Sequence, residues 1–168
     1  MLANHVYWNL DGFTAGPGKN ILNNTLHMPY SKRAIVVDNI LIPTGQIESV
    51  KGSPLDFTSP KQLGRDIEQA HKCGFNCTGY DNAFILDKPI SSGHDSADLT
   101  VLSLSSPVTG IKMDIKTNQG GIQIYSCVGQ NGSIPAKKSQ QHGGSTKTFV
   151  EKSGCVCNRP SPKPISPC

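Results

Sequence analysis

The sequence predicts an all-β protein, and three of its features support this fold class. The 168 residues include 17 glycines and 12 prolines, which favour many turns over long helices. Only 36% of the residues are hydrophobic and 17% are charged, a balance that points the same way. The apolar residues Ile111, Met113 and Ile115 alternate with charged ones, and this period of two is the pattern of a half-buried strand.

Short runs of β-branched and aromatic residues between turn residues predict the individual strands. In chain order, we expect strands at 34–37, 83–86, 99–101, 111–115 and 122–127. The last two are separated by Thr-Asn-Gln-Gly-Gly at 117–121, a segment that favours a reversal of the chain. This spacing predicts a β-hairpin made of residues 111–115 and 122–127.

One short helix and one irregular tail complete the predicted elements. Ser59 is a suitable helix cap, Pro60 suits the first helical position and Gln62 completes a capping box, so a helix is expected that ends near Gly74. Four prolines lie between residues 160 and 168, and proline interrupts a strand ladder. We therefore expect an all-β domain at 1–156, whose architecture the resemblance given below specifies, and a Pro-rich irregular tail at 157–168.

The distribution of charged and apolar residues argues against two classes of partner, nucleic acids and membranes. Sixteen basic and 12 acidic residues give a formal charge of +4, and they are scattered without a dense basic cluster, so no nucleic-acid partner is expected. The sequence has no run of about 18 apolar residues, so no membrane-spanning segment is expected.

The six cysteines favour thiols or disulfides over a metal site. Cys73 and Cys77 are four residues apart and Cys155 and Cys157 are two apart, but neither pair has a second pair or a histidine at zinc-site spacing. We expect no metal and no cofactor. Six cysteines allow 15 pairings, among which the sequence does not choose.

Three N-glycosylation sequons, at Asn23, Asn76 and Asn131, and the cysteines suit a secreted parent protein. The first residues, Met-Leu-Ala-Asn-His, lack the basic and apolar regions of a signal peptide. A cytoplasmic and a secreted location therefore both stay open at this point.

Four sequence segments, in one order across residues 3–154, resemble the aldose 1-epimerase (galactose mutarotase) family. They are Asn-His-Val-Tyr-Trp-Asn-Leu at 4–10, Val-Asp followed by Leu-Ile-Pro-Thr-Gly and Leu-Asp-Phe within 37–57, Gly-Tyr-Asp-Asn-Ala-Phe at 79–84, and Gly-Ile-Gln-Ile-Tyr at 121–125.

This resemblance implies a galactose mutarotase-like β-sandwich, or supersandwich. It also implies an isomerase that interconverts the α and β anomers of free aldoses such as glucose or galactose, with a monosaccharide as partner. Family members run to about twice this length, so the resemblance implies that this chain holds an incomplete sandwich.

The resemblance also implies the site residues. His5 matches the catalytic histidine of the family, and an imidazole with an ordinary pKa of about 6.5 is suited to act as general acid on the ring oxygen. Asp81 and Gln123 match positions that bind sugar hydroxyls, for which a carboxylate and an amide have the required acceptors and donors. Tyr7 and Trp8 either stack on a sugar or supply core on alternating sides of a strand.

The general base of the family, a glutamate, has no counterpart in this chain. Depending on the alignment, Asn158 or Arg159 occupies its place, and neither side chain accepts a proton at neutral pH. Loss of such a base lowers a rate by about 10² to 10⁴. We therefore expect a weak or inactive epimerase homologue, and the alternative is a non-catalytic carbohydrate-binding module.

Overall fold

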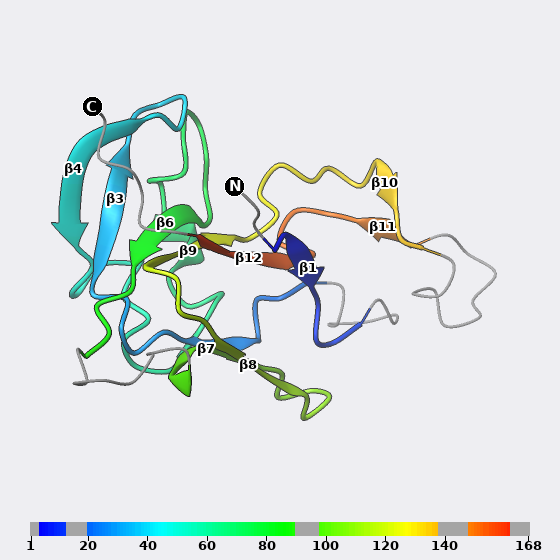
Figure 1. Ribbon diagram of the computed structural model, residues 1–168. Helices are drawn as coiled ribbons and strands as arrows, with labels where there is room; N and C mark the ends of the chain where they lie inside the picture. Colours follow the sequence, from blue (N-terminus) through cyan, green and yellow to red (C-terminus); the bar gives the residue numbers. More distant parts are fainter. Residues whose placement is uncertain (1–3, 13–19, 90–97, 138–147, 162–168) are drawn as a thin grey trace.

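The computed structural model describes residues 4–12, 20–89, 98–137 and 148–161, and short strands dominate it (Figure 1). The predicted all-β fold class is confirmed. The larger sheet has six strands, in the spatial order β1 (Val6–Trp8), β12 (Val156–Ser161), β9 (Gly121–Tyr125), β6 (Asp81–Ile85), β3 (Arg33–Val37) and β4 (Pro43–Ser49).

Two smaller sheets accompany it. A four-stranded sheet has the order β5 (Lys61–Gln62), β2 (Thr25–His27), β7 (Thr100–Ser105) and β8 (Lys112–Lys116). A two-stranded ribbon of β10 (Ile134–Pro135) and β11 (Phe149–Val150) extends to one side in Figure 1. In the part of the chain that the structure describes, no helix is long and apolar enough to cross a membrane.

The hydrophobic core includes side chains of the six-stranded and the four-stranded sheets. Phe84, Ile122 and Ile124 belong to it from the larger sheet, and Leu26 and Leu104 from the smaller one, all at most 1% exposed. Alternate residues of one strand point to opposite faces, so each of these strands buries one side chain in two. The larger sheet therefore has a second face outside this core.

The strands predicted at 34–37, 83–86 and 111–115 are confirmed as β3, β6 and β8, and those at 99–101 and 122–127 correspond to β7 and β9. Their ends differ by at most four residues from the predicted ones. The alternation of apolar and polar residues therefore predicts the positions of these strands in the sequence.

The predicted hairpin of 111–115 and 122–127 is wrong, because its two strands belong to different sheets. β8 pairs with β7, whereas β9 pairs with β6 and β12. β8 carries Lys112, Asp114 and Lys116 on its exposed side and lies at a sheet edge. β9 has three buried residues and lies in the middle of the larger sheet, so burial rather than proximity in sequence selects its partners.

The predicted helix after Ser59 is also wrong. This segment holds β5 and a single 3₁₀ turn at Ile67–Gln69. The backbone N–H groups of Leu63 and Gly64 donate to the carbonyls of Asn24 and Leu22 at 2.9 and 2.8 Å, so they are not available to a helical ladder. Tertiary pairing overrides the local capping signal here.

The predicted irregular tail begins too early, because residues 157–161 belong to β12. Among the described residues, β12 has strands on both sides only at Cys157 and Asn158, and beyond Asn158 it pairs with β9 alone. Pro160 lies in this one-sided part, where a missing N–H is tolerated. The rest of the predicted tail, 162–168, lies outside the described residues.

Candidate functional site

One row of side chains crosses four strands of the larger sheet on the face away from the core. The antiparallel pairing sets Tyr7 opposite Cys157, Cys157 opposite Tyr125, and Tyr125 opposite Asp81. Residues that are directly opposite in an antiparallel pair point to the same face. The row therefore brings together segments from both ends of the described chain.

A second row lies two residues further along the strands. Gln123 and Arg159 are opposite each other in β9 and β12, and each is two residues from a member of the first row, so they share its face. His5 joins this face through its Nδ1 atom, which lies 3.3 Å from the Cys157 Sγ atom. We call this surface the polar face, and the residues of it that matter for the site are His5, Tyr7, Asp81, Gln123, Cys157 and Arg159.

Asp81 and Gln123 are joined directly. The Gln123 Nε2 group donates a hydrogen bond to the Asp81 Oδ1 atom at 2.7 Å, across 42 residues of sequence. Burial raises the pKa of the Asp81 carboxyl above its ordinary value, while the bond from Gln123 and the charge of Arg159 oppose this rise. The carboxylate is thus partly desolvated and held in one orientation.

His5 is exposed and is held by Cys157 and Tyr7. Its ring centroid lies 5.2 Å from that of Tyr7, and burial raises the pKa of the Cys157 thiol, which keeps this group protonated at neutral pH. A thiol that donates to Nδ1 leaves the proton of a neutral imidazole on Nε2. This arrangement favours a tautomer with Nε2 as a donor.

His5 and Asp81 lie on the same face of the larger sheet, on either side of β12 and β9. Their strands are three spacings apart, about 14 Å. The His5 ring reaches over β12 to Cys157, and the Asp81 carboxylate reaches over toward β9 to Gln123. Each of the two side chains therefore contacts one of the two strands that separate them.

The two aromatic residues of β1 take opposite sides. Tyr7 is 49% exposed on the polar face, whereas Trp8 packs against the core on the other face. Of the two roles that the sequence leaves open, a stacking surface therefore fits Tyr7 and a core position fits Trp8.

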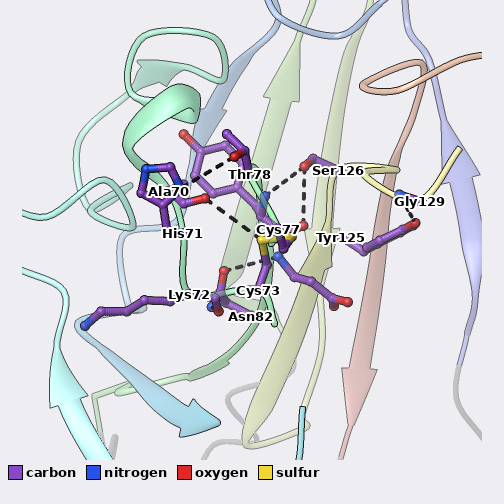
Figure 2. Close-up of a disulfide and its surroundings, with 12 residues drawn as sticks. Ala70, His71, Lys72, Cys73, Cys77, Thr78, Asn82, Tyr125, Ser126 and Gly129 are labelled. Atoms are coloured by element: carbon purple, nitrogen blue, oxygen red, sulfur yellow. Dashed lines mark hydrogen bonds between the residues drawn. A yellow bond between two sulfur atoms is a disulfide. The ribbon is translucent and has the colours of Figure 1, made fainter. Parts of the chain in front are cut away.

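The segment before β6 fixes where Asp81 begins the strand (Figure 2). A disulfide joins Cys73 to Cys77, and the Asn82 side chain donates to the Lys72 carbonyl at 2.6 Å. Gly79 has a φ of +135°, and a Cβ there would lie 2.2 Å from a methyl carbon of Val128, so only glycine fits.

A second disulfide fixes β12 against β9. It joins Cys127 to Cys155, which are the next same-face positions after Tyr125 and Cys157 in the pairing of these two strands. Among the described cysteines, Cys157 is free and buried. The sequence did not indicate Cys157 as a site residue.

Strand pairing separates the two residues that the sequence offers at the glutamate position. Asn158 is opposite Ile124, is 4% exposed and points toward the core, where its Nδ2 group has no hydrogen-bond partner. Arg159 is opposite Gln123 on the polar face. The alternation of Cys155, Cys157 and Arg159 with their neighbours indicates a strand in which Arg159 shares a face with Cys157. The prolines from Pro160 onward argue against a strand, so the sequence predicted an irregular tail instead.

A polar cavity of about 440 Å³ lies elsewhere, lined by residues that include Asp56, Lys61, Arg65 and Asp66. Lys61 is its buried charge, and the Nζ group donates to the Pro54 carbonyl at 2.7 Å and to Asp66 at 2.9 Å. These bonds satisfy the ammonium group and give it a structural role. Within the described residues, no group of three or more His, Cys, Asp or Glu side chains is placed to hold a metal ion.

Comparisons with known proteins show which family has this fold. Residues 1–155 match the family model of aldose 1-epimerase. The chain is 43% identical to the probable aldose 1-epimerase of Arthroderma benhamiae over 93% of this chain and 39% of that one. It is 30% identical to the galactose mutarotase of Homo sapiens over 82% of this chain and 38% of that one.

A solved structure gives the same result. The aldose epimerase homologue from C. elegans superposes with a TM-score of 0.67 at 25% identity, over 94% of this chain and 40% of that one. The chain therefore belongs to the aldose 1-epimerase family and has a galactose mutarotase-like fold. It spans about two fifths of the length of these relatives.

Proposed function

We propose that the polar face binds a free aldose, such as glucose or galactose, and that this chain derives from an enzyme that interconverts the α and β anomers. The observation that carries the proposal is the convergence of His5, Asp81 and Gln123 on one face, although Asp81 and Gln123 are 42 residues apart in sequence and His5 is further away still. Family membership supports the same substrate class.

Each side chain has a role that suits its surroundings. Ring opening requires a proton for the ring oxygen, and the imidazolium form of His5 supplies it from Nε2 as a general acid and is left as the neutral imidazole. Asp81 and Gln123 accept and donate hydrogen bonds to sugar hydroxyls and so orient the ring. Tyr7, exposed beside His5, provides an apolar surface for the sugar.

Arg159 limits the chemistry. Anomer interconversion also requires a base for the anomeric hydroxyl, and a guanidinium stays protonated at neutral pH. With Arg159 on the polar face, the described chain binds the sugar and catalyses weakly or not at all. This residue is the specific observation that favours the second candidate function, a non-catalytic carbohydrate-binding module.

Polarimetry on freshly dissolved α-D-galactose tests the proposal. The chain itself should leave the drift to equilibrium close to the buffer rate, and Arg159→Glu should accelerate it by about 10² to 10⁴ relative to the unsubstituted chain. Arg159→Gln removes the cation without adding a base, so it serves as the matched control and should not accelerate the drift.

A folded Arg159→Glu chain that binds galactose without accelerating the drift would leave the binding-module function as the better account. A second substitution, His5→Ala, should abolish any gain, because it removes the acid. Each variant is checked for a cooperative thermal transition, so that misfolding is not mistaken for a lack of activity.

A further inference from the structure

The three sequons all present their asparagine at the surface. They are Asn23-Asn24-Thr25, Asn76-Cys77-Thr78 and Asn131-Gly132-Ser133, and each first residue is exposed. A sequon is a weak pattern in sequence alone, but modification requires an accessible acceptor. All three asparagines therefore meet the requirement of accessibility.

Two of the acceptors occupy equivalent positions in tight turns. The Asn24 N–H donates to the Ile21 carbonyl at 3.0 Å, and the Cys77 N–H donates to the Gly74 carbonyl at 3.4 Å. Asn23 and Asn76 are therefore each the third residue of a four-residue turn, and Asn76 has a φ of +50°. Side chains at such turn apices project into solvent.

The third acceptor forms an Asx turn. The Asn131 Oδ1 atom accepts the Ser133 N–H at 3.1 Å, which leaves the amide nitrogen pointing away from that contact. None of the three sequon asparagines uses its Nδ2 group as a hydrogen-bond donor to the described residues.

Other asparagines in this chain are used differently. Asn24, which follows Asn23 directly, is fully buried and donates to Asp11 at 3.0 Å. Asn82 is 3% exposed and donates to the Lys72 carbonyl. Exposure at the sequons is therefore not a general property of the asparagines in this fold.

The disulfides are an independent observation that points to the same compartment. Cys73–Cys77 encloses Asn76, and Cys127–Cys155 begins four residues before Asn131. Disulfides persist in oxidising compartments such as the lumen of the endoplasmic reticulum, which is where N-linked oligosaccharides are attached.

We propose that Asn23, Asn76 and Asn131 are N-glycosylated. The donor is an oligosaccharide linked to a polyprenyl pyrophosphate. The bond from its anomeric carbon to the pyrophosphate oxygen breaks, and a bond to the asparagine Nδ2 atom forms. Nδ2 loses one proton, and the lipid pyrophosphate is the leaving group.

Asn76 differs from the other two sites because the Cys73–Cys77 disulfide closes a ring of five residues around it. A segment tied at both ends of so short a ring cannot be drawn into the cleft of a transferase. Transfer to Asn76 therefore precedes closure of the disulfide, and the two reactions compete. Asn76 should be occupied in a smaller fraction of molecules than Asn131.

The first experiment uses the protein isolated from the cells that make it. Treatment with peptide N-glycosidase in ¹⁸O-water converts each glycosylated asparagine to a labelled aspartate, which peptide mass spectrometry locates. The label is expected at Asn23, Asn76 and Asn131 and not at the exposed controls Asn39 and Asn118, which are outside sequons. A folded, disulfide-bonded chain without label at these three positions would overturn the proposal.

The second experiment tests the competition at Asn76. Cys73→Ser removes the disulfide and leaves the sequon intact, so occupancy of Asn76 should rise while that of Asn23 stays the same. Unchanged, incomplete occupancy at Asn76 in this variant would refute the competition. Asn76→Gln in the same background should remove the glycan signal and thereby confirm its position.

Discussion

Arg159 of β12 is directly opposite Gln123 of β9, and Gln123 in turn donates to Asp81. The guanidinium is therefore placed beside the carboxylate of the polar face, whose pKa it lowers in opposition to burial. Asn158, its neighbour in sequence, points to the opposite side of the sheet. One step of strand register thus decides which of these two side chains lies on the polar face.

Asp81 should destabilise the fold at neutral pH. Its folded pKa is raised by burial, so the folded state holds the proton more tightly than the unfolded state does. Stability is therefore lost as pH rises from the unfolded pKa of about 3.9 through the higher folded pKa. Asp81→Asn, which keeps an acceptor for Gln123, should unfold at a higher temperature than the unsubstituted chain at pH 7.

The same pair of proteins provides the control for this prediction. Below the unfolded pKa of about 3.9, both forms are neutral at this position and the difference in melting temperature should shrink. Thermal melts at several pH values measure it. A difference in melting temperature that is independent of pH would show that the charge on Asp81 is not its cause.

Asn158 should be a weak point of the core. Its buried Nδ2 group has no hydrogen-bond partner, and an unsatisfied buried donor costs about 1–3 kcal/mol. Asn158→Leu should therefore raise the free energy of unfolding in urea by about 1–2 kcal/mol. Arg159→Leu, one residue further, should leave it within about 0.5 kcal/mol, because that side chain faces outward.

The reverse ranking of these two variants would contradict the register of β12 against β9. It would then place Arg159 toward the core and Asn158 on the polar face. The midpoint and the slope of the urea transition separate a change in stability from a change in the unfolded state.

The two disulfides should differ in their contribution to stability. Cys127–Cys155 joins residues 28 apart and Cys73–Cys77 joins residues 4 apart. Loop-closure entropy predicts about 3.5 kcal/mol for the first and about 2 kcal/mol for the second. Urea unfolding of Cys127→Ala/Cys155→Ala and of Cys73→Ala/Cys77→Ala measures both losses, and equal losses would show that loop length is not the deciding factor.

The sequence predicted strands well and their partners poorly, for a physical reason. The apolar alternation that marks β8 and β9 is local, whereas the burial that sends β9 between β6 and β12 depends on the whole sheet. The helix after Ser59 failed similarly, since Leu63 and Gly64 pair with residues 22–24. Local capping signals are weaker than such tertiary hydrogen bonds.

The candidate site was predictable only in part. His5, Asp81 and Gln123 follow from motifs, and the pairing of strands brings them to one face. The contact of Cys157 with His5 spans 152 residues, and no local pattern reports it. The side of Arg159 depends on a strand that continues into Pro160, which sequence rules exclude from central strands.

A nuclear magnetic resonance titration tests the central claim most directly. The ¹⁵N-labelled chain is titrated with D-galactose, and Asp81→Ala serves as the control that removes one ligand group. Shift changes should concentrate at His5, Tyr7, Asp81 and Gln123 and weaken in the control. Changes that centre instead on the cavity around Lys61 and Asp66, or their absence from a folded chain, would contradict sugar binding at the polar face.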